Sequence, residues 1–493
     1  MNTESTTPRG VTLVKIDTSF GSDAGGDFTL PDYMPEIRRL LYVSSSVLPE
    51  GKFLNGGVLE LDGTLTYNAV YVGDDGSVTS APLVTEYGAD TALGAETSGT
   101  DGIFVDTQIE STTCRATGPR SLNIKSRLKF HVTSDGELES APVSDGGIEK
   151  LTEDVKCAVR YRGSVTESVA GEFSAKSGSK PVICDGFITV RGASPTDGGV
   201  RAEGVVTVRC LMKDGEGYAL SSCEIPFDAT VPIESDTPLD GARAWGRIAS
   251  LNVAQNEDGT YTVSVEYDLD AEAYGEENAE ICSDAYSRER EYECEYRDVE
   301  IPEMIAFGTK RAELSGETEL RGEADGARVL DTAPAIIQAA IALSDGKVTL
   351  SGSVKLRALI SAGSEIYAKE VEMPFRFDIA DAPEGVATPD LQTSLVGTEC
   401  ASSAKITGDA LTAKCDVAFT YSVARRRRAT VVTAVRTGDE LPAADPCIKV
   451  YYPERDESEW SVAKRYLADR ARLERNNSFP SGVAEKGKPV III

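Results

Sequence analysis

The sequence predicts a mainly β protein, in which three tandem β-sandwich or barrel-like repeats precede a small α+β module of the order strand–helix–helix–strand. Three observations lead to this prediction: a strand pattern that recurs three times, glycine turns around each copy, and a change of pattern after residue 446. The strand pattern reads GTLTYNAVY from Gly63, GVVTVRCLM from Gly204 and GSVKLRALI from Gly352. Largely apolar positions alternate with often polar ones in each copy, which is typical of a half-buried strand.

The flanks of the three copies match as well. A glycine turn and a short strand precede each copy, and a second glycine turn and another strand follow it. The leading glycines lie 141 and 148 residues apart, which is the size of an ordinary domain and too long for a solenoid repeat. Unrelated hairpins in a β-rich chain are the alternative. The expected domains are three repeats at 1–145, 146–298 and 299–442 and a terminal module at 447–493.

Length and composition limit the function. A chain of 493 residues has room for about three or four domains. Its net charge of −30 argues against a nucleic-acid partner and suits a protein that recruits basic partners. We see no apolar run of the roughly 18 residues that would span a bilayer, and the first residues lack the pattern of a secretory signal.

The ten cysteines form no C-x-x-C pair and no zinc-ligand spacing. They indicate reduced, buried thiols in a cytosolic protein, with disulfides or metal ligation as the alternative.

Taken in order, the first repeat is expected to open with a short strand at 11–16 and a glycine-rich loop. A small helix then begins near Pro35, with Ile37, Leu40 and Leu41 on its apolar face. Each repeat has a second half of paired strands joined by a turn. These strands are expected at 103–109 and 122–132, at 244–253 and 261–269, and at 403–406 and 411–423.

Two charged stretches interrupt the repeats. Residues 274–298 carry mixed charges, which favours an exposed strand or connecting arm over a catalytic cluster. The run Arg425 to Arg428 predicts a solvated turn paired with carboxylates, with a docking patch as the alternative. Residues 443–446 are expected to be a linker.

The terminal module begins with an alternating strand at 448–452. Asp456 or Ser458 is expected to cap a helix with an apolar face of Trp460, Ala463 and Tyr466 or Leu467. A second helix starts near Asp469, and a last strand covers 490–493.

The sequence offers little for catalysis. The one histidine, His131, has no evident partner, so a structural or exposed role is favoured over a catalytic triad. A phosphate-binding glycine loop and a metal-ligand cluster are both lacking, so we expect no enzyme, no metal and no cofactor. A β-rich hydrolase is the alternative, and it would require a deep cleft lined by close carboxylates between the two halves of a repeat.

One segment resembles a known family. LPDYMPEIRRLLYVSSSV is similar to the opening signature of the SPOCS domain, a module of bacterial spore-coat proteins, and the β-rich repeat after it is similar to that module too. The residues that carry this motif are Leu30, Pro31, Asp32, Tyr33, Pro35 and Ile37.

The terminal module resembles a LysM domain, a module that usually binds N-acetylglucosamine polymers. Matching positions are Trp460, Val462, Ala463, Tyr466, Leu473 and Asn476, whereas the Gly-Asp-Thr-Leu run of that family is replaced here by residues 456–459. The resemblance implies a partner- or glycan-binding site formed by Tyr452, Glu457, Ser458, Trp460 and Asn476.

Together the two resemblances imply a non-enzymatic scaffold or adaptor of spore-coat assembly, made in the mother-cell cytoplasm and placed at the forespore surface. Its partner would be a spore-coat morphogenetic protein, the ATPase of the coat's basement layer in known cases, bound through the LysM-like module. The alternative is a protein that binds peptidoglycan or cortex glycan through the same module. Neither function involves nucleic acid or a membrane span.

Overall fold

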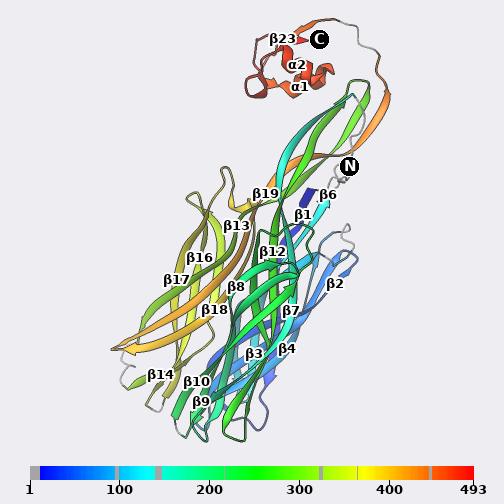
Figure 1. Ribbon diagram of the computed structural model, residues 1–493. Helices are drawn as coiled ribbons and strands as arrows, with labels where there is room; N and C mark the ends of the chain where they lie inside the picture. Colours follow the sequence, from blue (N-terminus) through cyan, green and yellow to red (C-terminus); the bar gives the residue numbers. More distant parts are fainter. Residues whose placement is uncertain are drawn as a thin grey trace.

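The computed structural model describes residues 11–94, 99–100, 102–138, 147–215, 217–320, 326–363, 365–442 and 447–493. Most of these residues form long antiparallel strands, and the two α-helices of this part lie near the C-terminus (Figure 1). The protein is therefore mainly β, as predicted. The expected linker at 443–446 and the expected boundary after residue 145 lie outside the described residues. No described helix has both the length and the apolar character needed to cross a membrane.

Three sheets are built around the glycine-led segments, each of which is the central strand of its sheet. The first contains β2 (Ile37–Asn55), β3 (Val58–Gly73) and β4 (Val78–Ala92). The second contains β8 (Lys180–Thr196), β9 (Gly199–Asp214) and β10 (Gly217–Pro232). The third contains β15 (Ile336–Ser344), β16 (Lys347–Ala362) and β17 (Glu365–Asp381), with the short β14 (Ala327–Thr332) beside β15 on the same edge of β16.

The leading glycine has the same place in all three sheets. Gly63, Gly204 and Gly352 are each the sixth residue of a 16-residue strand. A Cβ atom there would lie 2.4, 2.2 and 1.9 Å from a carbonyl oxygen of the neighbouring strand. The opposite neighbour is aromatic each time, namely Tyr87, Phe227 and Phe375. Glycine is required because the two backbones approach too closely for a side chain.

Three further sheets complete the body. They contain β1 (Val11–Thr29), β6 (Ser121–Leu138) and β5 (Ile103–Gly118); then β11 (Gly241–Gln255), β12 (Thr260–Ser287) and β7 (Ile148–Ser174); then β13 (Arg290–Glu319), β19 (Ala410–Glu440) and β18 (Leu391–Thr407), each in spatial order. Each packs on one glycine-led sheet through buried apolar side chains, as Leu65 on β3 does with residues of β6. The result is three β-sandwiches. A 3₁₀ turn, η1 (Thr388–Asp390), precedes β18.

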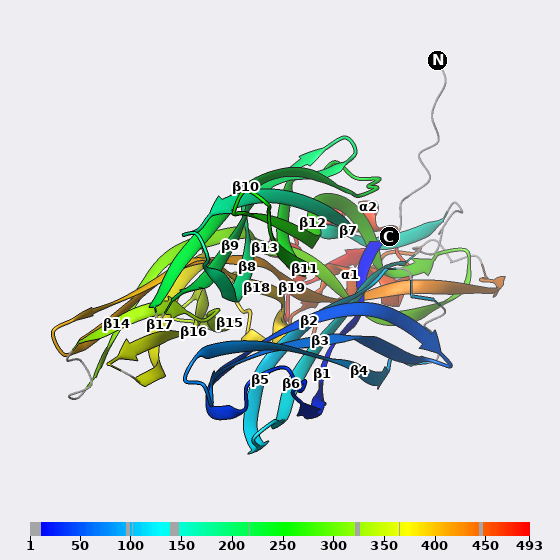
Figure 2. The same cartoon turned by 90° about the horizontal axis from the view of Figure 1, so that it is seen from below.

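The three sandwiches meet at two shared apolar clusters. Val70, Leu211 and Leu359, each seven residues after its leading glycine, are buried together in one of them. In the other cluster, the first strands of the sandwiches contribute Val11, Val155 and Val299, which are 144 residues apart in sequence. Figure 2 shows the sandwiches grouped around one centre. They form one packed body, because burying these contacts stabilises the whole group. The expected boundary between 298 and 299 falls within β13.

Two local predictions near the N-terminus are wrong. The expected helix at 35–41 is the start of β2, and the expected glycine-rich loop is part of β1, which continues to Thr29. β2 has bulges between Ile37 and Arg39 and between Leu40 and Tyr42. Each bulge shifts the alternation by one residue, so apolar residues recur at the spacing of a helix although the backbone is extended.

The C-terminal module has the predicted order of elements. Its strands β20 (Lys449–Tyr451) and β23 (Val490–Ile492) pair antiparallel, and α1 (Glu459–Tyr466) and α2 (Arg470–Asn476) lie between them in sequence. A second short pair, β21 (Glu457–Ser458) and β22 (Val483–Ala484), and the 3₁₀ turn η2 (Pro480–Gly482) were not predicted. Figure 1 shows the module at the far end of the long strands that leave the sandwiches.

Candidate functional site

Local capping explains why two short helices form in the terminal module. The Ser458 side chain accepts a hydrogen bond from the Ser461 N–H and caps α1, and Asp469 caps α2 in the same way through the Arg472 N–H. Between them, Leu467 adopts a left-handed conformation (φ 50°) that ends α1. Of the two caps considered for α1, Ser458 is therefore the one used.

Trp460, a predicted site residue, faces the body of the protein. Its indole N–H donates to Asp284 Oδ2 over 2.8 Å, and its ring packs against Tyr286 with centroids 5.1 Å apart. Both partners belong to β12. Trp460 is 8% exposed and lies in a buried cluster shared by the module and the long strands. The arrangement leaves its ring little room to stack on a sugar.

The hairpin of β12 and β13 is the surface on which the module sits. Asp284 also accepts hydrogen bonds from Lys464 Nζ and the Tyr296 hydroxyl, both 2.6 Å long. Burial alone would raise the pKa of Asp284, but these donors hold it below its ordinary value. Tyr286 donates to the Ala468 carbonyl, and Arg288 pairs with Asp469. Residues 274–298 thus form a strand arm, as expected, and the arm carries the module.

The other predicted module residues divide between structural roles and the surface. Glu457 accepts hydrogen bonds from Tyr451 and Arg465, which hold its pKa below its ordinary value although burial acts in the opposite direction. Tyr452 and Asn476 are exposed. Asn477, which follows the predicted Asn476, ties α2 to β23 through hydrogen bonds with Leu473 and Ile491. Of the five predicted residues, Tyr452 and Asn476 are therefore exposed, whereas Trp460, Glu457 and Ser458 make contacts within the protein.

The module instead presents an apolar surface. Val450 and Ile491 lie directly opposite each other on β20 and β23, and are 53% and 37% exposed. The other face of this pair packs inward through Tyr451, Val490 and Ile492. We name the outward side the β20–β23 outer face, which consists of Ile448, Val450, Tyr452, Ile491 and Ile493. Six of the twelve exposed large apolar side chains among the described residues belong to the module, so this surface is unusually apolar for the protein.

The LPDYMPE segment forms the tight connection between β1 and β2. Leu30 is buried in the first sandwich, and Arg120 donates to the carbonyls of Pro31 and Met34. The carbonyl of Pro35 accepts from the Tyr71 hydroxyl, and the Ile37 N–H donates to Pro119. These bonds hold the segment in one shape. Asp32 is exposed, and Tyr33, 85% exposed, is presented at the tip.

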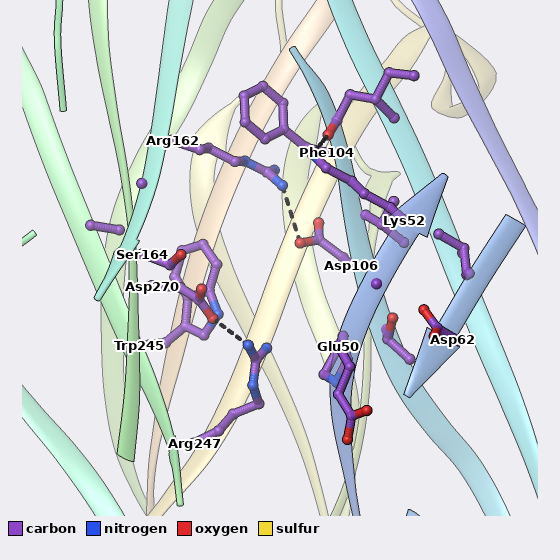
Figure 3. A pocket seen from close by; sticks show the side chains of 18 of the residues that line it. Glu50, Lys52, Asp62, Phe104, Asp106, Arg162, Ser164, Trp245, Arg247 and Asp270 are labelled. Atoms are coloured by element: carbon purple, nitrogen blue, oxygen red, sulfur yellow. Dashed lines mark hydrogen bonds and ion pairs between the residues drawn. The ribbon is translucent and has the colours of Figure 1, made fainter. Parts of the chain in front are cut away.

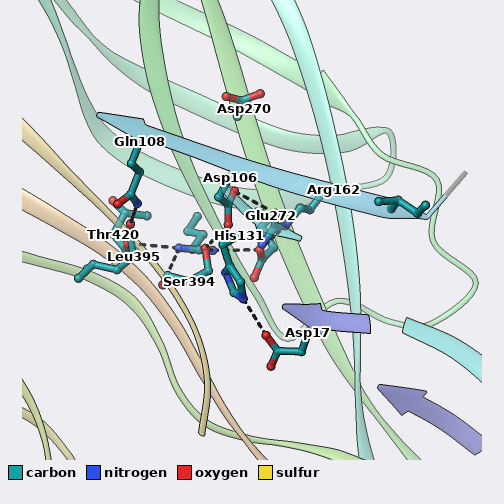
Figure 4. A network of polar contacts seen from close by, with 12 residues as sticks. Asp17, Asp106, Gln108, His131, Arg162, Asp270, Glu272, Ser394, Leu395 and Thr420 are labelled. Atoms are coloured by element: carbon teal, nitrogen blue, oxygen red, sulfur yellow. Dashed lines mark hydrogen bonds and ion pairs between the residues drawn. The ribbon is translucent and has the colours of Figure 1, made fainter. Parts of the chain in front are cut away.

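A buried polar network joins the three sandwiches (Figure 4). Glu272 on β12 accepts from Arg162 Nε over 2.6 Å and from Arg243 over 2.9 Å. Arg162 also donates to Asp106 of the first sandwich, whose other oxygen accepts from Ser394 of the third. Burial would raise the pKa of Glu272, but the two guanidinium groups hold it well below its ordinary value. The network fixes how the sandwiches sit against one another.

No family model matches the chain, and neither curated proteins nor solved structures gave a match. The assignment of function therefore depends on the geometry described here and on the sequence motifs.

Two expectations about reactive side chains are corrected. His131 has a partner, because its Nε2 lies 2.7 Å from Asp17 Oδ1. Cys184 and Cys210, which face each other on β8 and β9, are joined by a disulfide, whereas the other eight cysteines are free as expected. No group of three or more described His, Cys, Asp or Glu residues is arranged to hold a metal ion.

The arginine run Arg425 to Arg428 lies in strand β19, so the expected turn is wrong. The expected pairing with carboxylates is confirmed. Arg425 and Arg427 contact Glu303, and Arg426 and Arg428 contact Glu300. Arg427 also reaches Glu153 of the second sandwich, so the run adds to the contacts between sandwiches.

Proposed function

We propose that this protein is a non-enzymatic adaptor of spore-envelope assembly, which holds a coat morphogenetic protein through its terminal module. Three features support the proposal: the motif at residues 30–37, the packed body of three sandwiches, and the apolar outer face at the far end of the arm. In this reading the chain acts at the forespore surface, in the mother-cell cytoplasm. The body serves as a spacer and support, and the module binds.

The proposal includes a domain assignment. We infer that the sandwiches are three copies of one SPOCS-like domain, because their sheets have the same strand order and their leading glycines meet the same kind of neighbours. The terminal module is assigned as a LysM-like domain on its strand–helix–helix–strand order and on Trp460, Ala463 and Leu473, which are all buried in its core.

The single observation that carries the adaptor function is the β20–β23 outer face. Exposed apolar side chains that lie together are typical of protein interfaces, because burying them stabilises a complex. The distribution of charged residues also favours the terminal module as the binding site. Residues 447–493 contain nine Lys and Arg against seven Asp and Glu, whereas the rest of the chain contains 41 against 73. The acidic body would attract basic partners, whereas the module is nearly neutral. We therefore expect the occupant of the outer face to be an apolar patch of a partner protein that is not strongly basic.

The test is a comparison of two surface variants of the full chain. V450K combined with I491K places two charges in the outer face, and we expect recovery of the partner from sporulating cells to fall at least about tenfold, since each buried charge costs more than 1 kcal/mol. V84K is the matched control, because Val84 is a valine on β4 of the body that is 61% exposed, against 53% for Val450. Equal recovery with both variants would contradict the proposal.

Glycan binding by the module remains the alternative, and the exposed Tyr452 favours it. The engagement of Trp460 and Glu457 in internal contacts weighs against it. Sedimentation with purified peptidoglycan separates the two functions, because the adaptor is expected to stay in the supernatant.

A further inference from the structure

A crevice lies between the first and second sandwiches, away from the terminal module (Figure 3). Its volume is about 400 Å³, which is within the range of small-molecule sites. One wall comes from β2 to β5 and the other from β7, β11 and β12, so both sandwiches contribute. The crevice separates two repeats and does not lie between the two halves of one repeat. It is thus not the cleft that the hydrolase alternative required.

The crevice is lined by aromatic rings and by charged side chains from both sandwiches. Tyr87, Phe104 and Trp245 provide the rings, of which Tyr87 and Trp245 are buried and Phe104 is half-buried. Arg247 pairs with Asp270 on the second sandwich over 3.0 Å, while its buried Nε has no hydrogen-bond partner. Burial raises the pKa of Asp270 above its ordinary value although Arg247 acts against it. The crevice therefore holds a guanidinium group with hydrogen-bonding capacity that a ligand could use.

The charges of the lining exclude several ligand classes. It contains four carboxylates and three cationic side chains, and two of the carboxylates, Asp106 and Asp270, are already paired with arginines. An apolar ligand would leave these charges without water, which is costly. A phosphate or other polyanion would face more carboxylates than cations. An uncharged ligand with many hydroxyl groups fits best, because each hydroxyl both donates and accepts.

We propose that this crevice binds a short uncharged saccharide. The apolar face of a sugar ring would pack beside the half-buried Phe104, while its hydroxyls accept from the partly exposed guanidinium group of Arg247 and donate to the exposed Asp62 carboxylate. The crevice is at the lower end of the size range for ligand sites, which suits one or two sugar units. This proposal is independent of partner binding by the β20–β23 outer face.

The test uses ligand-observed NMR on the full chain with glucose, N-acetylglucosamine, its β-1,4 dimer and maltose, and with glucose 6-phosphate as an anionic comparison. Ser164 lines the mouth of the crevice and is exposed, so S164W should block the site without disturbing a core. Ser168 is exposed on the same strand outside the crevice, and S168W is the matched control. We expect S164W to weaken binding of at least one uncharged sugar at least about tenfold, with S168W like the wild type.

R247Q is a second variant with the same expected direction, since it removes the guanidinium group that the proposal places against the sugar hydroxyls. The V450K and I491K variant should bind the sugar like the wild type, which separates this site from the module. No binding of any uncharged sugar by the wild type would overturn the proposal. Equal binding by S164W and S168W, or tighter binding of glucose 6-phosphate than of glucose, would overturn it as well.

Discussion

Replacing Glu272 by alanine is expected to lower the free energy of unfolding by about 3–5 kcal/mol. Glu272 and Arg243 are both fully buried, and Arg162 shares the same carboxylate oxygen. Without that carboxylate, two guanidinium groups would stay in the interior with less compensating charge. The loss is large because a buried charge cannot regain its water while the sandwiches stay packed.

Chemical unfolding of the full chain measures this effect. E266A is the matched control, because Glu266 is an exposed glutamate on the same strand β12, and its replacement should change the free energy of unfolding by less than about 0.5 kcal/mol. If E272A costs no more than E266A, the polar network does not hold the sandwiches together.

Replacing Asp185 by asparagine is expected to stabilise the protein at pH 8 and to have little effect near pH 4. Burial, with a contribution from Asp331, raises the pKa of Asp185 to about 7, and Arg209 opposes this only in part. Arg209 directs its donors to the third sandwich, through Asp331, Thr332 and Ser402, and leaves Asp185 Oδ2 unpaired. Asp185 is therefore a buried carboxyl group whose ionised form has few hydrogen bonds or ion pairs to stabilise it.

The direction of this pH dependence follows from the linkage between proton binding and folding. A carboxyl whose pKa is higher in the folded state binds its proton more tightly when folded, so its contribution to stability is complete below about pH 4 and is lost as the pH rises through about 7. The loss is on the order of 4 kcal/mol. Unfolding curves of wild type and D185N between pH 4 and 8 measure it. D228N, at an exposed carboxylate on β10, should keep the wild-type trend. A constant difference between D185N and wild type at all pH values would contradict this account.

Structural features that depend on residues close together in the chain could be predicted from the sequence. The strands around Gly63, Gly204 and Gly352 were predicted because apolar and polar residues alternate in their sequences, although the structure buries both faces in the second half of each strand. The two helices of the module were predicted because Ser458 and Asp469 cap them locally. The helix expected at 35–41 failed for a physical reason, since bulges in β2 produce the apolar spacing of a helix in an extended strand.

The contacts between sandwiches could not be predicted in this way. Asp106, Arg162 and Ser394 meet in one network although they are far apart in sequence, and each looks like an ordinary polar residue on a strand. The same holds for Trp460, whose acceptor Asp284 lies 176 residues earlier in the chain. The apolar outer face is visible only after β20 and β23 pair, because Val450 and Ile491, 41 residues apart in sequence, then lie opposite each other.

The most direct test of the adaptor proposal is site-specific photo-cross-linking of the full chain during spore formation. A photoreactive residue at position 450, in the β20–β23 outer face, should form a discrete cross-link to one partner protein, and the same residue at position 84 should not. Cross-links of equal yield at both positions, or none at position 450, would contradict the claim that this protein binds its partner through the terminal module.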